Sequence, residues 1–224
     1  MFVSFGVRSA DNPRLWDMGL HINTNGFGLG STLRLSENRM IDVDFSSFKH
    51  QRESKVVNHN FENKLPFVFG KLYHTGNFRI TYGVSKNLIQ KQNQGDVTVD
   101  LRMSAGLAIA TLRPVYLRLA EFDGDKDVYH IVKYTPENVP STSDVVGYAH
   151  SGYGWDEINY KPGLTSKTGI ALTWQNPATL ARSIGVGTNV NYFPKGLNIM
   201  AFEPTQYLFV SGYIEFKLVF NSRN

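Results

Sequence analysis

Apolar and polar residues alternate at every second position over long parts of the chain. Between Val97 and Ile109 every odd position is apolar, and every even position is polar or small. A period of two is the pattern of a β-strand, because successive side chains of a strand point to opposite faces of its sheet. This stretch exceeds an average strand of about 5–6 residues and covers the roughly 9–11 residues that a tilted strand needs to cross a bilayer.

The same alternation recurs elsewhere. At the C-terminal end the apolar positions are Leu208, Val210, Ile214, Phe216, Leu218 and Phe220, and this ending on Phe resembles the C-terminal signal that outer-membrane insertion machinery reads. Shorter alternating runs cover residues 16–23, 27–35, 41–46, 78–85, 115–119, 167–174 and 183–192. There is no amphipathic helix of convincing length, and no run of about 18 apolar residues that would form a transmembrane helix.

Turn signals separate the runs. Asn25-Gly26 predicts a tight type I′ hairpin, and further turn clusters occupy residues 36–39, 92–95 and 123–124. Long polar connections near His50–Leu65 and Thr135–Pro162 are typical of a membrane barrel, which carries long loops on one side and short turns on the other.

Together these signals predict an all-β fold. We expect an antiparallel transmembrane β-barrel of about 10–12 strands with meander topology, forming a single domain over residues 1–224. The count includes Val128–Tyr134, paired through Asp123–Asp127, and depends on Phe2–Arg8 and Leu197–Ala201. A soluble β-sandwich or a lipocalin-like barrel remains open, because the apolar faces would then point inward.

Composition narrows the functional classes. The 224 residues include no cysteine, which excludes thiolate metal sites, disulfides and cysteine nucleophiles. The net charge is only +4 and the charges are interspersed, so we expect no nucleic-acid partner. The segment Met1–Arg8 lacks the pattern of a signal peptide. Since an outer-membrane protein must be exported, either the numbering describes a mature or trimmed chain or the membrane interpretation is wrong.

The polar strand faces are the most informative feature. If the apolar faces point to lipid, the opposite faces bring many charged side chains into one narrow interior, where opposite charges must pair because an unpaired buried charge is very costly. We expect a filled lumen rather than a solute channel. The residues of this predicted lumen charge network are Arg34, Asp42, Asp44, Arg79, Asp100, Arg102, Arg118, Lys167, Glu215 and Lys217.

A series of short motifs carries a family resemblance. In order, they are His21–Leu29, Phe48–Glu53, Pro66–Leu72, Arg79–Gly83, Arg113–Leu117, Lys161–Gly163, Phe193–Lys195 and Ile199–Ala201. Together they resemble a family of uncharacterised outer-membrane β-barrel proteins of Bacteroidota. Gln51 stands where the family pattern has Pro, and Arg113 where it has Lys. The resemblance implies a barrel in the bacterial outer membrane and implies no catalytic residues.

Two groups of residues are weak candidates for other chemistry. His150-Ser151 with Asp144 and Asp156 contains the residue types of a hydrolase triad, but sequence proximity in a Gly-rich loop does not show mutual hydrogen-bond reach. An ordinary polar loop is the favoured interpretation. The basic-aromatic segment Phe67–Tyr73 is a partner-docking strand, an ordinary barrel strand or a loop folded into the lumen.

Metal binding is not expected. Asp123, Asp125 and Asp127 lack the Gly and the bidentate Glu of an EF-hand, so a solvated acidic turn is favoured. His50 and His59 have no third ligand placed by spacing. We therefore expect no metal and no cofactor.

These features predict a non-enzymatic integral outer-membrane barrel. We expect an accessory or structural subunit of an assembly, secretion or uptake complex, in contact with outer-membrane lipid and other outer-membrane or periplasmic proteins. A small porin or transporter is the alternative, and a lipid-modifying barrel enzyme is a third.

Overall fold

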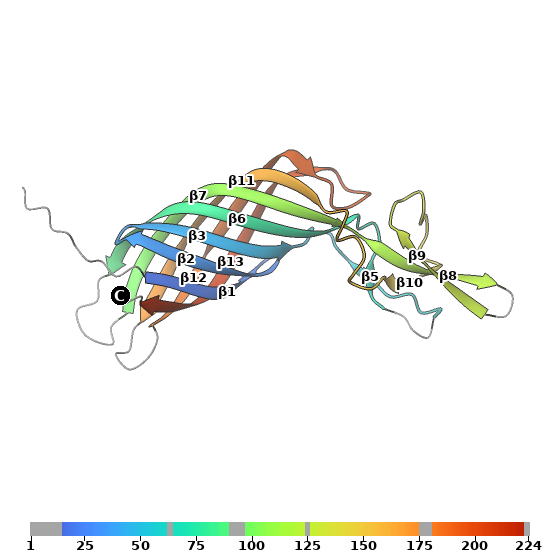
Figure 1. The fold of residues 1–224 in the computed structure, drawn as a ribbon, viewed down its shortest axis with the longest axis horizontal. Coiled ribbons are helices and arrows are strands. Elements are labelled where there is room, and N and C mark those ends of the chain that lie inside the picture. Colours follow the sequence, from blue (N-terminus) through green and yellow to red (C-terminus); the bar gives the residue numbers. More distant parts are fainter. Residues whose placement is uncertain (1–14, 62–64, 90–96, 124–125, 175–180, 222–224) are drawn as a thin grey trace, which may run out of the picture.

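A computed structural model describes residues 15–61, 65–89, 97–123, 126–174 and 181–221. These residues form β-strands and connections (Figure 1). None of them forms a helix that is long and apolar enough to cross a membrane. The strands are β1 (Leu15–Asn23), β2 (Gly26–Ser36), β3 (Arg39–Phe48), β4 (Lys55–Val56), β5 (Phe67–Val68), β6 (Tyr73–Ile89), β7 (Val97–Pro114), β8 (Tyr116–Asp123), β9 (Lys126–Lys133), β10 (Val145–Tyr148), β11 (Asn159–Trp174), β12 (Ala181–Leu197) and β13 (Gln206–Asn221).

Eight of the described strands close into a barrel in the order β1-β13-β12-β11-β7-β6-β3-β2. Each strand is antiparallel to its neighbours, and the barrel strands follow one another in chain order, so the predicted antiparallel meander is confirmed. The first and last strands form the closing seam, with partners from Leu15↔Asn221 to Asn23↔Tyr213. Closure removes every free sheet edge within the barrel, as a membrane-spanning sheet requires.

The expected count of about 10–12 barrel strands is wrong. The runs at 115–119 and Val128–Tyr134 do form strands, β8 and β9, but these leave the barrel and pair in a separate three-stranded sheet of order β10-β8-β9. Alternation is a property of any half-buried strand and therefore did not distinguish them from barrel strands. Phe2–Arg8 lies outside the described residues, and residues 198–201 belong to the connection after β12.

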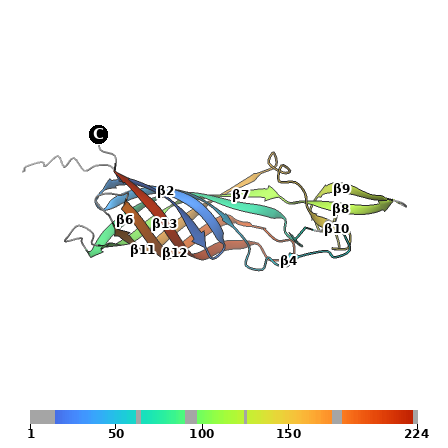
Figure 2. The ribbon, with the colours of Figure 1, turned by 90° about the horizontal axis from the view of Figure 1, so that it is seen from below.

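The connections divide the barrel into two unlike ends. The short turn at 37–38 and the C-terminal end of β13 lie at one end, here called the terminal end. The connections 49–72, 115–158 and 198–205 leave the other end, together with the hairpin turn at 24–25. Figures 1 and 2 show the sheet of β8, β9 and β10 projecting from this end, away from the C-terminus. We call residues 115–158 the appendage and this end the appendage end.

The outward face of the barrel is apolar. Leu20, Ile22 and Leu107 are 68%, 71% and 65% exposed, and many other aliphatic side chains on the barrel strands are exposed beside them. Aromatic side chains flank this belt. Trp16 stacks on Phe220 at the terminal end with ring centroids 5.0 Å apart. Exposed aromatic residues towards the appendage end include Phe27, Phe45, Phe78, Tyr160 and Tyr192.

An apolar belt between aromatic girdles, around a polar interior, is the surface of a transmembrane barrel. A soluble sandwich or lipocalin-like barrel would bury its apolar faces, so this arrangement overturns the soluble alternative.

A charge placed on the belt should be costly in a depth-dependent way. We expect Leu107→Arg, near the middle of β7, to lower the free energy of unfolding in lipid vesicles by about 2–4 kcal/mol. Leu208→Arg, near the appendage end of β13, should cost about 0–1 kcal/mol because the guanidinium reaches the interface. Urea titration of both variants measures the difference. Equal losses would contradict the assignment of Leu107 to the middle of the bilayer.

Candidate functional site

The inward faces of the barrel strands carry a dense set of charges. Of the ten residues predicted for the lumen, the structure places nine in the interior, and it adds Asp17 of β1. The acidic side chains are Asp17, Asp42, Asp44, Asp100 and Glu215, and the basic ones are Arg34, Arg79, Arg102, Lys167 and Lys217. The two sets are equal in number, so the interior can be neutral without a bound ion.

Lys217 of β13 lies at the centre of the set. Its ammonium is 3.5 Å from a carboxylate oxygen of Asp17, 3.5 Å from one of Glu215 and 3.8 Å from one of Asp42. It also donates a hydrogen bond of 2.7 Å to the Thr32 hydroxyl, which in turn donates to Asp42. One cation therefore links carboxylates from β1, β3 and β13.

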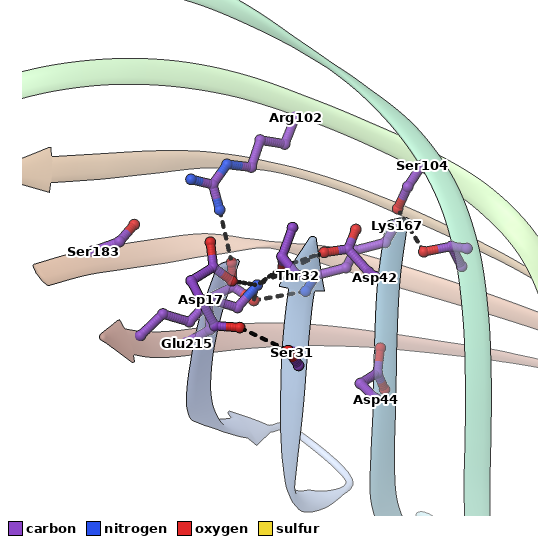
Figure 3. Close-up of polar contacts among 12 residues, drawn as sticks. Asp17, Ser31, Thr32, Asp42, Asp44, Arg102, Ser104, Lys167, Ser183 and Glu215 are labelled. Carbon is purple, nitrogen blue, oxygen red and sulfur yellow. Dashed lines mark hydrogen bonds and ion pairs between the residues drawn. The ribbon is translucent and has the colours of Figure 1, made fainter. Parts of the chain in front are cut away.

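Glu215 is the matching acidic centre (Figure 3). It accepts a 2.6 Å hydrogen bond from Lys167 and lies 3.8 Å from the guanidinium of Arg102, which is itself 3.7 Å from Asp100. The Lys167 ammonium stands 4.5 Å from the centre of the Tyr213 ring. Glycines make room for these groups, since a Cβ at Gly185 would contact Glu215 and one at Gly169 would contact the Tyr213 hydroxyl.

Arg79 and Asp44 form a second, tighter pair. They are direct partners across β3 and β6, and the Arg79 guanidinium contacts one Asp44 oxygen through Nε at 2.6 Å and through a terminal nitrogen at 2.5 Å. Both side chains are buried. In a low-dielectric interior such a charge-assisted contact is strong, and losing one partner would strand the other.

Arg34 completes the set at 3.8 Å from Asp100, whereas Arg118 does not belong to it. The prediction for Arg118 is wrong because its strand, β8, lies in the appendage, where its guanidinium stands 5.2 Å from the centre of the Tyr129 ring. Asp17 was missed although its alternation with Trp16 and Met18 in the sequence marks the same inward face.

A neutral polar layer follows the charged one. Asn77 donates to the Asn191 side-chain oxygen at 3.2 Å, and Thr165 donates to the same oxygen at 2.8 Å. A cavity of about 20 Å³ lies among Asn23, Asn77, Asn191 and their neighbours, and another of about 10 Å³ lies beside Lys217. The larger has room for about one water molecule.

An apolar layer closes the appendage end. Phe193 and Phe209 from β12 and β13 meet edge to face, with ring centroids 5.9 Å apart. They are part of a buried cluster, to which the connections 49–72 and 198–205 contribute residues at the appendage end. Its members are Val68, Ala108, Ala110, Leu112, Phe193, Leu197, Ile199, Met200 and Phe209. The interior therefore changes from ionic to amide to apolar along the barrel axis.

The connections 49–72 and 198–205, here called the cap, are tied to each other above this layer. Backbone hydrogen bonds join Leu72 to Ile199 at 2.8 Å and Ala201 to Gly70 at 2.7 Å. Buried Lys71 contacts Glu53 at 2.6 Å. Burial lowers the pKa of the Lys71 ammonium, and the hydrogen bond to Glu53 opposes that effect. Neither residue was predicted, because the period-two pattern does not extend into these connections.

The segment Phe67–Tyr73 is part of the cap. Phe67 is fully buried in the appendage core, and its neighbour Val68 belongs to the barrel cluster below. Of the three interpretations of this segment, a free docking strand is excluded, because its main apolar side chains already fill two cores.

The candidate triad is not assembled. Asp144, His150, Ser151 and Asp156 are exposed, and the hydrogen bonds of this loop do not join their side chains to one another: the backbone amide of Gly152 donates to the His150 ring, while the Ser151 carbonyl accepts from Arg113 and Trp155. Among the described residues, no group of three or more His, Asp or Glu side chains is arranged to hold a metal ion. The 123–127 turn includes residues outside the described part of the chain.

Comparisons with known proteins give similarity at the level of fold. No family model matches the chain, and no curated protein matches it. Similar solved structures include the N-terminal β-barrel domain of OprF from Pseudomonas aeruginosa, with 7% identity and a TM-score of 0.43 over 93% of this chain and 98% of that one. Neisserial surface protein A (NspA) has 12% identity and a TM-score of 0.40 over 93% and 96% of the two chains.

A third similar structure is Ail, the attachment invasion locus protein of Yersinia pestis, in complex with the heparin analogue sucrose octasulfate. It has 10% identity and a TM-score of 0.37 over 92% of this chain and 97% of that one. Because these identities and TM-scores are low, the function has to be inferred from the interior and surface residues of the chain itself.

The Arg79–Asp44 pair allows a clean test of the interior charges. Arg79→Met should lower the free energy of unfolding by about 3–5 kcal/mol, because it leaves the Asp44 carboxylate buried without its partner. Adding Asp44→Leu should restore most of that loss, since the remaining pair is apolar. Urea unfolding in vesicles gives the double-mutant cycle, with Arg182→Met on the exposed face of β12 as the control. Additive losses in the double variant would show that the two side chains do not act as a pair.

Proposed function

We propose that this protein is a non-enzymatic structural or accessory subunit of a complex in the bacterial outer membrane, with a lumen closed by its own side chains. The observation that carries the proposal is the filled interior. Paired charges, amides and an apolar cluster follow one another along the barrel axis, and the interior cavities beside Asn191 and beside Lys217 have volumes of only about 20 Å³ and 10 Å³. A barrel of eight strands is narrow enough for side chains to fill it.

The interior supports a structural role over a pore. A conducting lumen needs a continuous polar path, whereas here Phe193 and Phe209 cover the polar layers and the cap lies on top of them. The charged side chains are turned towards one another rather than towards a water-filled space. Solute passage would require the apolar layer of Phe193 and Phe209 and the cap to open together.

The unequal ends of the barrel support an orientation. Outer-membrane barrels carry short periplasmic turns and longer extracellular loops. The connections 49–72 and 115–158 both leave the appendage end, while the two-residue turn at 37–38 lies at the terminal end. The appendage accordingly lies outside the cell, and the charged half of the lumen lies towards the periplasm.

The appendage supports the role of a complex subunit. It exceeds what is needed to connect β7 to β11, and it has its own core around Leu117, Val139 and Val145. Among the described strands β9 pairs only with β8, so one of its edges is open to strand addition. Tyr129 and Ile131 of β9 are exposed on this sheet, at 45% and 42%. Exposed tyrosines beside an open edge suit contact with another protein of the outer membrane or with the outer surface of a complex.

A tie of side chains joins β8 and β9 to the last residues of the appendage. Lys133 of β9 and the Tyr116 hydroxyl both donate to the Glu157 carboxylate, just before β11 begins. The hydrogen bond from Lys133 lowers the pKa of this carboxyl group. Because Phe67 and Val68 are adjacent and join the appendage core to the barrel cluster, we propose that residues 1–224 fold as one domain. An origin in Bacteroidota remains part of the proposal and rests on the sequence motifs.

Planar-bilayer recording tests the closed lumen. We expect no steady large conductance from protein whose folding is verified by heat-modifiable gel mobility. Arg102→Ala should destabilise the barrel, because Asp100 keeps Arg34 alone as an ion-pair partner and Glu215 loses one of its three cations. Arg182→Ala on the outer face should leave the stability and the absence of conductance unchanged. Steady conductance of the unmodified protein, or a stable Arg102→Ala barrel with altered ion selectivity, would instead establish the small pore.

Affinity capture from detergent-solubilised membranes tests the accessory role. We expect a second outer-membrane protein to be recovered with the wild-type chain, and Tyr129→Ala to weaken its binding by more than about tenfold, as at an interface hot spot. Tyr207→Ala is the matched control, because this tyrosine is similarly exposed but lies on barrel strand β13. Recovery that is identical for both variants would remove the appendage from the interface.

A further inference from the structure

The apolar belt of the barrel contains a hollow that the closed lumen does not explain. It has a volume of about 240 Å³ and lies on the outer face over β6, β7 and β11. Tyr82, Val84 and Met103 stand along one side of it, each about half exposed. Ala105 of β7 and Ser166 and Thr168 of β11 line the other side, where their smaller side chains project less from the barrel surface. The surface therefore has a ridge beside a depression.

The hollow lies midway across the membrane. Tyr82, Ala105 and Ser166 are aligned across the three strands by the pairing register, and each is near the middle of its own strand. The neighbouring row towards one end of the barrel is apolar, with Ile80, Leu107 and Leu164, and the row on the other side contains Val84, Met103 and Thr168. The depression is thus enclosed within the hydrocarbon region and is not part of an interfacial girdle.

Hydroxyl groups converge on this depth. Tyr82, Ser166 and Thr168 line the hollow, and Thr188 of β12 is the direct partner of Thr168. Within the described residues the Tyr82 hydroxyl makes no hydrogen bond, and the same is true of the Ser166 and Thr168 hydroxyls. Hydrocarbon offers them no partner, and an unsatisfied hydroxyl in an apolar medium costs free energy. An occupant that brings its own hydrogen-bonding groups would remove this cost.

We propose that this hollow is the contact surface for a second copy of the chain, in a dimer whose two-fold axis is parallel to the membrane normal. Barrels inserted in the same direction present the same residues at the same depth, so a two-fold axis through the hollow brings hydroxyls opposite hydroxyls. The Tyr82 ridge of each copy enters the depression over Ser166 of the other. A lipid acyl chain fills the same volume but supplies no hydrogen-bond partner.

The dimer places Ala105 nearest the axis. Ala105 lies between the ridge residue Tyr82 and the depression residue Ser166 in the register, so two copies of Ala105 face each other closely. β1 lies four strands away from β7 in either direction around the barrel, so the exposed Leu20 of β1 is on the opposite side of the belt. This contact depends on insertion in a membrane and is independent of whether the lumen is closed.

The absence of cysteine in the chain makes single-cysteine cross-linking direct. In lipid vesicles, Ala105→Cys should give a covalent dimer with a short bifunctional maleimide, and Leu20→Cys should give only the background of random collisions. Both variants must retain heat-modifiable gel mobility as evidence of folding. Equal cross-linking of the two variants, or none at Ala105, would overturn the proposal.

Removing one hydroxyl tests the hydrogen-bonding part of the contact. Tyr82→Phe should lower the dimerisation constant, measured by photobleaching of labelled protein at increasing lipid dilution, by about threefold to tenfold. Tyr192→Phe, a comparably exposed tyrosine on β12, should leave it unchanged. A wild-type protein that is monomeric at every dilution would show that a lipid or another protein occupies the hollow, and would overturn the dimer.

Discussion

Backbone hydrogen bonding in hydrocarbon is the constraint on which the rest of the structure depends. No water reaches a strand in the membrane, so each backbone amide and carbonyl needs a partner in a neighbouring strand, and the sheet has to close. Pairing of β1 with β13 provides that closure. Once eight strands are closed, alternation sends every second side chain into a space that only side chains can fill. The polar character of the inward positions then requires that those side chains satisfy one another.

Different groups occupy the interior at different heights along the barrel axis. Near the terminal end, cations are shared among carboxylates, and Lys217 alone links Asp17, Asp42 and Glu215. Towards the appendage end, amides and then aromatic rings replace the charges. Ion pairing is expensive to bury and contributes little net stability, while it strongly specifies which side chains are neighbours. The apolar layer contributes in the opposite way, because it stabilises by burial and is less specific about its partners.

Much of the barrel could be predicted from period two, and the failures have physical causes. Asp44 and Arg79 can be assigned to one face by counting, because each alternates with apolar residues along a strand that stays in the sheet. The same counting was wrong for Arg118, since nothing in the pattern marks that the chain leaves the barrel after Pro114. Lys71 and Glu53 could not be predicted at all, because they meet through irregular connections. Likewise, the hollow beside Tyr82 arises from side-chain sizes on three strands that only register brings together.

The seam between the first and last strands ties the pairing of the interior charges to the arrival of β13. Lys217 and Glu215 both belong to β13, and the bond from Lys217 to Thr32 spans 185 residues of sequence. Until that strand arrives, Asp17 and Asp42 lack the ammonium they share, and Lys167 lacks its main carboxylate. A nascent sheet without β13 therefore carries charged side chains that lack these partners as well as two open edges, and both penalise its entry into lipid. Contacts this far apart in sequence make closure of the barrel slow, because the entropy cost of bringing the two ends of a long segment together comes before the contacts form.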